Sequence, residues 1–139
     1  MQIDNSNDSE DHKQINGMPK VLLPQLQKAI NQALCSNYIF KHGSIVLKNG
    51  KPCGKGFNRL KTDPNLLRRY NYTSRHAECQ ALINAKHRGD CLIIIRVTRR
   101  GNLSMSRPCE KCIKYIKENS SIRKIYFSNW KGAMEKLDM

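Results

Sequence analysis

The sequence predicts an α/β protein with three layers, in which helices lie on both faces of a mixed sheet. Three observations carry this prediction. Helical and strand-like patterns alternate along the chain, the segment "CLIIIRV" at residues 91–97 is apolar almost throughout, and Asn49-Gly50 separates two strand-like runs. A continuous apolar run is typical of a strand covered on both faces, and an Asn-Gly pair is typical of a tight hairpin. The expected sheet therefore has an antiparallel hairpin at one side and parallel strands elsewhere.

The chain length predicts one folded domain behind a polar leader. A chain of 139 residues is long enough to bury its own core. Residues 19–139 are therefore expected to form a single domain, and residues 1–18 a disordered acidic leader. The acidic residues near the start are Asp4, Asp8, Glu10 and Asp11, with no Lys or Arg among the first twelve residues.

Charge and hydropathy indicate partners that carry phosphate and argue against a membrane. The formal net charge is +14, and a basic surface attracts phosphates, whether on free nucleotides or on a polymer. No apolar run reaches the roughly 18 residues that a membrane-spanning helix needs. The N-terminus lacks the basic and apolar regions of a secretory signal. We therefore expect a cytoplasmic protein with no membrane partner.

The first helix and the hairpin follow from local patterns. Apolar side chains three or four positions apart predict an amphipathic helix, and Pro24 fits its first turn. These apolar residues are Leu22, Leu23, Leu26, Ala29, Ile30, Ala33 and Leu34. The segment "GSIVLKNGKPCGKGFN", residues 43–58, then predicts two strands around the Asn-Gly turn.

Residues 59–73 lack a clear period and predict a long loop with a helical turn. Loops of this length are often functional. The arginines beside this loop would bind a phosphate or simply face solvent, and its tyrosines would stack on bases or pack against the core. The residues concerned are Arg59, Arg68, Arg69, Arg75, Tyr70 and Tyr72.

The second half of the chain predicts two more helices and two more strands. A helix is expected over residues 75–87, followed by the apolar strand 91–97. Another helix is expected to begin near Pro108, and "IRKIYF", residues 122–127, predicts a further strand. The tail "SNWKGAMEKLDM" fits either a short helix or an edge strand.

Metal-ligating side chains lie at the starts of these two helices. His76 opens one helix, and Cys109 and Cys112 open the other. Helices that flank one strand of a βαβ unit begin at the same end of the sheet, which is where open α/β sheets place their sites. Zinc prefers four ligands. If Cys79 is the fourth, the site is a closed structural Cys₃His site; if water is the fourth, Glu78 stands within reach as a proton carrier.

The H-x-E and P-C-x-x-C motifs carry a family resemblance. With "HAE" at 76–78 and "PCEKC" at 108–112, the chain resembles the CMP/dCMP-type zinc-dependent cytidine deaminase superfamily. The resemblance extends to "GKGFNR", residues 54–59, and covers about residues 22–127. It implies the cytidine-deaminase-like α/β/α fold.

The resemblance also implies roles for individual residues. His76, Cys109 and Cys112 would bind Zn²⁺, and Glu78 would be the catalytic general acid and base. Asn58 would contact the sugar of the substrate, although a cap at a strand end explains an asparagine there equally well. The backbone N–H of Ala77 and the carbonyl of Ser106 would contact the base.

The implied reaction is hydrolytic deamination of cytosine to uracil in a nucleotide, with release of ammonia. A substrate resembling dCMP or CMP is expected ahead of a nucleoside. Glu110 and Lys111 depart from the pair usual in tRNA adenosine deaminases, and Met105 departs from the tryptophan usual in polynucleotide cytidine deaminases. Two alternatives stay open: a deaminase acting on cytidine or adenosine within RNA or single-stranded DNA, and a non-catalytic nucleic-acid-binding domain with a structural Cys₃His zinc. A homo-oligomer is a further expectation.

Overall fold

The computed structural model of the chain describes residues 14–15, 17–37, 40–58 and 76–139. Residues 1–13 of the expected leader lie outside this set. So does the expected loop at 59–73, with its arginines and tyrosines. The described end of the leader forms a small hairpin between β1 (Gln14–Ile15) and β2 (Met18–Pro19). Met18 of this hairpin is fully buried in a core cluster with residues of α1 and the sheet.

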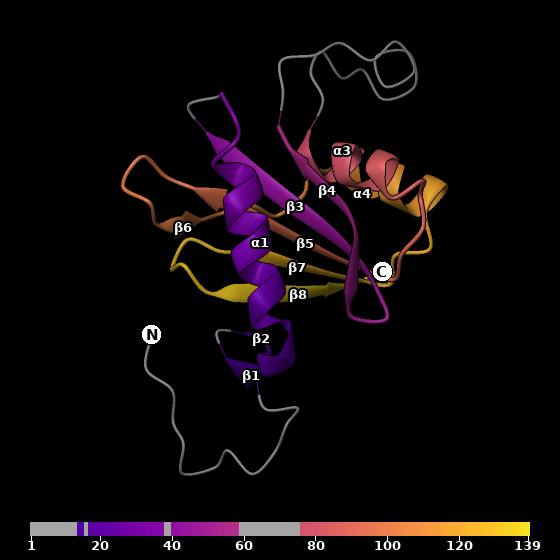
Figure 1. The fold of residues 1–139 in the computed structure, drawn as a ribbon, viewed down its shortest axis with the longest axis horizontal. Coiled ribbons are helices and arrows are strands. Elements are labelled where there is room, and N and C mark those ends of the chain that lie inside the picture. The colour runs from indigo at the N-terminus through magenta and orange to yellow at the C-terminus, as the bar shows by residue number, and fades with distance from the viewer. Residues whose placement is uncertain (1–13, 16, 38–39, 59–75) are drawn as a thin grey trace.

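One mixed sheet forms the centre of the molecule (Figure 1). Its strand order is β4-β3-β5-β7-β8, and the short β6 pairs with β5. The strands are β3 (Lys41–Lys48), β4 (Lys51–Phe57), β5 (Cys91–Val97), β6 (Leu103–Ser104), β7 (Lys124–Ser128) and β8 (Met134–Asp138). Asn49 and Gly50, at the turn between β3 and β4, both have positive φ angles, which confirms the predicted hairpin.

Helices cover both faces of this sheet. The helix α1 (Leu23–Ala33), preceded by a 3₁₀ turn at Lys20–Leu22, lies across one face. The helices α3 (Ala77–Asn84) and α4 (Glu110–Asn119) lie on the other (Figure 1). The predicted three-layer α/β/α architecture is confirmed. Within the described segments, no helix combines the length and apolar character needed to cross a membrane.

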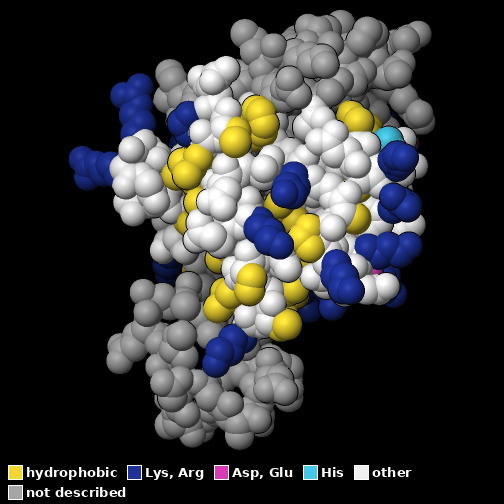
Figure 2. Space-filling view, viewed as in Figure 1, with side chains coloured by type: hydrophobic (Ala, Val, Ile, Leu, Met, Phe, Trp, Pro, Cys, Tyr) yellow, Lys and Arg dark blue, Asp and Glu magenta, His cyan; other side chains and the backbone are white. Residues whose placement is uncertain are grey.

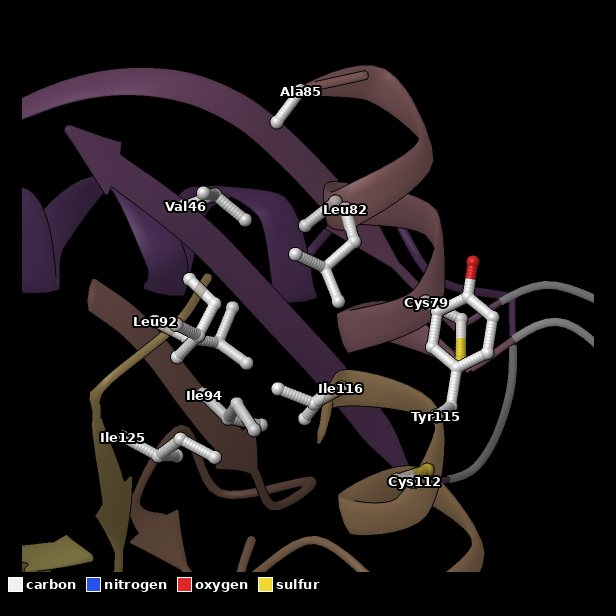
Figure 3. Close-up of a cluster of buried hydrophobic side chains, with 12 residues drawn as sticks. Val46, Cys79, Leu82, Ala85, Leu92, Ile94, Cys112, Tyr115, Ile116 and Ile125 are labelled. Carbon is white, nitrogen blue, oxygen red and sulfur yellow. The ribbon is translucent and has the colours of Figure 1, made fainter. Parts of the chain in front are cut away.

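The apolar strand β5 divides the core into two clusters. Successive side chains of a strand point to opposite faces. Leu92 and Ile94 therefore pack beneath α3 and α4, while Ile93 and Ile95 pack beneath α1. Figure 3 shows Leu82 of α3 and Ile116 of α4 among the side chains of the first cluster. Burial on both sides explains why the sequence of β5 is apolar at nearly every position.

The strand directions differ in part from the sequence-based expectation. Among the described strands, only β5 and β7 are parallel, whereas all strands outside the hairpin were expected to be parallel. The ambiguous tail is the edge strand β8, antiparallel to β7. A short turn at residues 129–133 joins them, and a connection this short can link only antiparallel strands.

Glycines of the G-x-G motif allow α3 to lie directly on β4. A Cβ atom at Gly54 would lie 2.3 Å from the carbonyl oxygen of Ala81, and one at Gly56 would lie 2.5 Å from the carbonyl oxygen of Ala77. Both glycines are buried. This close approach fixes the position of the first turn of α3, which carries His76 and Glu78 at its start.

We therefore expect Gly56→Ala to destabilise the protein. The added methyl group meets the backbone of α3, which cannot move aside without disturbing the core, and overpacking of this kind costs about 1–3 kcal/mol or more. Urea denaturation measures the change in the free energy of unfolding. Lys55→Ala, at the exposed position between the two glycines, is the control and should change stability by less than about 0.5 kcal/mol. Equal stabilities for the two variants would contradict the close-packing argument.

Candidate active site

The two helix starts bring His76, Cys109 and Cys112 together. His76 is the N-cap residue of α3 and Cys109 that of α4, and both have extended backbone conformations. Cys112 lies in the first turn of α4 and is buried, whereas Cys109 is exposed and His76 is half-buried. The ligand atoms of all three residues lie within 4.8 Å of one another. His76 Nδ1 is 3.2 Å from Cys112 Sγ.

This donor set fits a zinc ion. Zinc binds imidazole nitrogen at about 2.0–2.1 Å and thiolate sulfur at about 2.3 Å in a tetrahedral arrangement, so its ligand atoms lie about 3.5–3.8 Å apart. The separations in this cluster need only small adjustments to match. One imidazole and two thiolates are also the ligand types that zinc prefers. The cluster leaves one position of a tetrahedral ion to be filled.

Cys79 does not belong to this group of mutually close donors. It is fully buried on the sheet side of α3 and packs in the same apolar cluster as Leu82 and Ile116 (Figure 3). Its thiol still approaches the cluster. Hydrogen bonding with Cys109 and with Cys79, together with burial, raises the pKa of the Cys112 thiol.

Glu78 is a buried acid beside the cluster. Its side chain is in the first turn of α3 and is 7% exposed. Burial raises the pKa of the Glu78 carboxyl, and the nearby His76 opposes that shift. A hydrogen bond also joins the Glu78 and Cys112 side chains. A carboxyl group whose pKa is raised toward neutrality is suited to both accepting and donating a proton.

A cavity of about 330 Å³ opens over the cluster and Glu78. A volume of this size is at the lower end of the range for small-molecule sites. Its walls contain all seven residues to which the family resemblance assigned metal, catalytic or substrate-binding roles, and these come from three separate segments of the chain. The lining residues are Phe40, His42, Asn58, His76, Ala77, Glu78, Ser106, Arg107, Pro108, Cys109 and Cys112.

Asn58 caps the end of the hairpin while it lines the cavity. Its Nδ2 donates to the carbonyl of Phe40 at 2.7 Å, and its Oδ1 accepts from the N–H of His42 at 3.0 Å. The backbone N–H of Asn58 donates to the carbonyl of His42. The capping role is therefore present. One N–H of the amide is not used in these bonds, because an amide nitrogen carries two hydrogens.

Ser106 is held by its own side chain against the central strands. Its Oγ donates to the carbonyl of Ile94 at 2.9 Å and lies 2.8 Å from Ser128 Oγ. Its backbone N–H donates to the carbonyl of Ser128. This buried network fixes the short segment that leads into Pro108. It thereby also fixes the start of α4, which carries the ligands Cys109 and Cys112.

Phe40 and His42 line the cavity although neither was predicted from the sequence. The Arg96 guanidinium lies 4.4 Å from the centre of the Phe40 ring. Burial, and next the charge of Arg96, lower the pKa of His42 from 6.5 to about 4, so this imidazole is neutral near pH 7. No local motif marks either residue. The pairing of β3 with the end of β4 brings them to the cavity, and this pairing is a long-range feature.

The fold and the donor set define an α/β/α protein with a His/Cys/Cys metal centre beside a buried acid. A family model described as the cytidine and deoxycytidylate deaminase zinc-binding region matches residues 20–129. The chain belongs to this family, which confirms the resemblance seen in the sequence. Membership supports a zinc-dependent hydrolase that deaminates cytosine in nucleotides or nucleosides.

Solved structures of the same fold include deaminases of both kinds. The dCMP deaminase from the cyanophage S-TIM5 has a TM-score of 0.58 and 24% identity, covering 81% of this chain and 85% of that one. The same phage enzyme in complex with dCMP and dUMP gives 0.56 and 23%, over 81% and 83%. Cytidine deaminase from Burkholderia pseudomallei gives 0.56 and 17%, over 81% and 91%. These TM-scores show a shared fold. No curated protein sequence matches the chain.

Proposed function

We propose that this chain is a cytoplasmic zinc-dependent hydrolase that converts cytosine to uracil in a nucleotide resembling dCMP or CMP. The observation that carries the proposal is a single cavity whose wall holds both the His76, Cys109 and Cys112 cluster and the buried Glu78. A structural zinc has no use for a buried acid at an open cavity. A hydrolytic centre needs one.

In this proposal the metal ligands are His76, Cys109 and Cys112, and the bound zinc supplies activation of a water molecule. Glu78 takes a proton from that water and delivers it to N3 of cytosine. A bond forms between the water oxygen and C4, and the C4–N4 bond breaks. Glu78 transfers the second proton to the departing amine, so that water and cytosine yield uracil and ammonia.

The remaining wall residues bind and orient the substrate. The backbone N–H of Ala77 lies in the first turn of α3, where helix N–H groups have no partner within the helix. The proposal assigns this N–H and the carbonyl of Ser106 to the base, and Asn58 to the sugar. The buried network of Ser106 keeps its carbonyl at a fixed place, three residues before the ligand Cys109. A fixed carbonyl favours a single orientation of the cytosine ring.

A phosphate on the substrate is supported by the charges near the cavity. Arg107 lines both this cavity and a second one of about 590 Å³ along α4, whose wall contains Lys114 and Lys117 as well as Glu110 and Glu118. The Arg107 guanidinium lies over the ring of Phe127 at 5.7 Å, a contact that leaves its N–H donors available for an anion. The phage relative is described in complex with dCMP and dUMP.

Lys and Arg side chains elsewhere are spread over the surface. Figure 2 shows them scattered across the face that carries α1, where few Asp or Glu side chains are visible. A dispersed positive surface attracts nucleotides and polynucleotides alike. For this reason RNA and single-stranded DNA are included as competing substrates in the test below.

The test is deamination of a substrate panel by the zinc-loaded protein. The panel contains dCMP, CMP, cytidine, tRNA and single-stranded DNA, and the measurements are released ammonia and the identity of the product base. We expect uracil and ammonia from dCMP or CMP, with a higher kcat/KM than for cytidine. Release from tRNA or single-stranded DNA alone would replace the proposal with a polynucleotide deaminase. DNA binding that collapses at moderate salt, without any ammonia, would support a non-catalytic domain.

A further inference from the structure

We propose that His42 determines sugar specificity by binding, together with Asn58, one hydroxyl group of the substrate sugar. This inference rests on the proposed function, since it concerns the substrate of the same cavity. Beyond the proposed function, it names a residue of strand β3 that lies outside the metal-binding motifs and assigns to it the recognition of a sugar hydroxyl. Both side chains line the cavity beside Glu78 and the metal ligands.

His42 and Asn58 are fixed side by side by a shared set of hydrogen bonds. Asn58 Oδ1 accepts from the His42 backbone N–H at 3.0 Å, and the Asn58 backbone N–H donates to the His42 carbonyl at 3.3 Å. The carbonyl of Phe40 accepts from Asn58 Nδ2 at 2.7 Å and also from the His42 ring. Neither side chain can turn away without breaking a bond to the backbone.

These bonds determine what each side chain offers to a ligand. The Asn58 amide has one N–H left, which is a donor. A neutral imidazole has one N–H and one bare nitrogen, and the N–H of His42 is directed to the Phe40 carbonyl, so the bare nitrogen remains as an acceptor. Burial and the adjacent Arg96 favour this neutral form. The wall therefore presents one donor next to one acceptor.

A hydroxyl group is the ligand that matches this pair. Its oxygen can accept from Asn58 Nδ2, while its hydrogen is donated to the bare nitrogen of His42. A phosphate oxygen carries no hydrogen at neutral pH, and it would face the lone pair of the imidazole. The base is assigned in the proposed function to the Ala77 N–H and the Ser106 carbonyl, so it does not use these two side chains. A hydroxyl of ribose or deoxyribose is thus the group that satisfies both side chains.

The test measures whether the effect of removing a sugar hydroxyl depends on the side chain at position 42. Wild-type protein and His42→Phe are compared on CMP, on its 2′-deoxy and 3′-deoxy forms, and on the 2′,3′-dideoxy nucleotide, with equal zinc content verified for each protein. We expect removal of one particular hydroxyl to lower the wild-type kcat/KM by about tenfold or more, mainly through KM. The same removal should lower kcat/KM of His42→Phe by a clearly smaller factor, because the acceptor is already missing and only the Asn58 donor still binds the hydroxyl.

A second variant separates recognition from folding. His42→Gln retains an acceptor in the form of its side-chain carbonyl, and we expect it to recover part of the dependence on the hydroxyl. Equal losses on removing the hydroxyl in wild type and His42→Phe would overturn the inference, as would a wild type indifferent to every sugar hydroxyl. A wild type that deaminates no cytosine nucleotide at all would instead overturn the proposed function, and this inference with it.

Discussion

Glu78→Gln is expected to lower kcat for cytosine deamination by about 10²- to 10⁴-fold or more, the usual contribution of a positioned proton carrier. Glutamine has nearly the same shape as glutamate but can neither take up nor release the proton. Burial, which raises the pKa of the Glu78 carboxyl, suits this residue to holding a proton between two transfers. Steady-state ammonia release under saturating nucleotide measures the effect.

The zinc content of Glu78→Gln should remain at one ion per chain, because Glu78 is not a member of the His76, Cys109 and Cys112 cluster. Glu135→Gln, which changes an exposed glutamate of the edge strand β8, is the matched control and should retain wild-type turnover. Unchanged turnover in Glu78→Gln would remove this residue from the mechanism. Loss of zinc would show that the acid supports the metal centre instead.

The second large effect is expected from Cys112→Ser, with Cys79→Ser as its matched control. Cys112→Ser should abolish stable zinc binding and activity together, because a hydroxyl is a far weaker zinc ligand than a thiolate. Cys79→Ser should retain one zinc per chain and most of the activity, because Cys79 is not a member of the metal cluster. Metal analysis after gel filtration, together with ammonia release, measures both.

The comparison is informative because the two cysteines are alike in burial. Cys79 is 0% exposed and Cys112 is 1% exposed, so a hydroxyl placed at either site suffers a similar loss of solvation. Any difference in metal content therefore reports ligation and not core disruption. Loss of zinc from Cys79→Ser would support the closed Cys₃His centre, and with it the non-catalytic alternative.

Local patterns in the sequence predict most of the architecture. The amphipathic spacing of α1, the Asn49-Gly50 turn and the apolar run of β5 each depend on residues close together in the chain, and the structure confirms all three. The helix expected near Pro108 begins at Glu110 with Cys109 as its cap. A shift of this size is ordinary for a helix end.

Long-range pairing explains what the sequence did not reveal. The edge strand β8 is charged at every exposed position, and its direction depends on hydrogen bonds to β7. His42 lies at the cavity because β3 and the end of β4 are paired there, a relation that no motif records. By contrast, His76 and Glu78, and likewise Cys109 and Cys112, are neighbours within single motifs, so spacing alone predicted that each pair would act at a helix start.

X-ray absorption at the zinc edge of the loaded wild-type protein tests the central claim most directly, because it counts the sulfur atoms bound to the metal. We expect two sulfurs from Cys109 and Cys112, one imidazole nitrogen from His76, and an oxygen or nitrogen donor in the remaining position. A first shell containing three sulfurs would contradict it, because the metal centre would then be closed and Glu78 would have no reaction to serve.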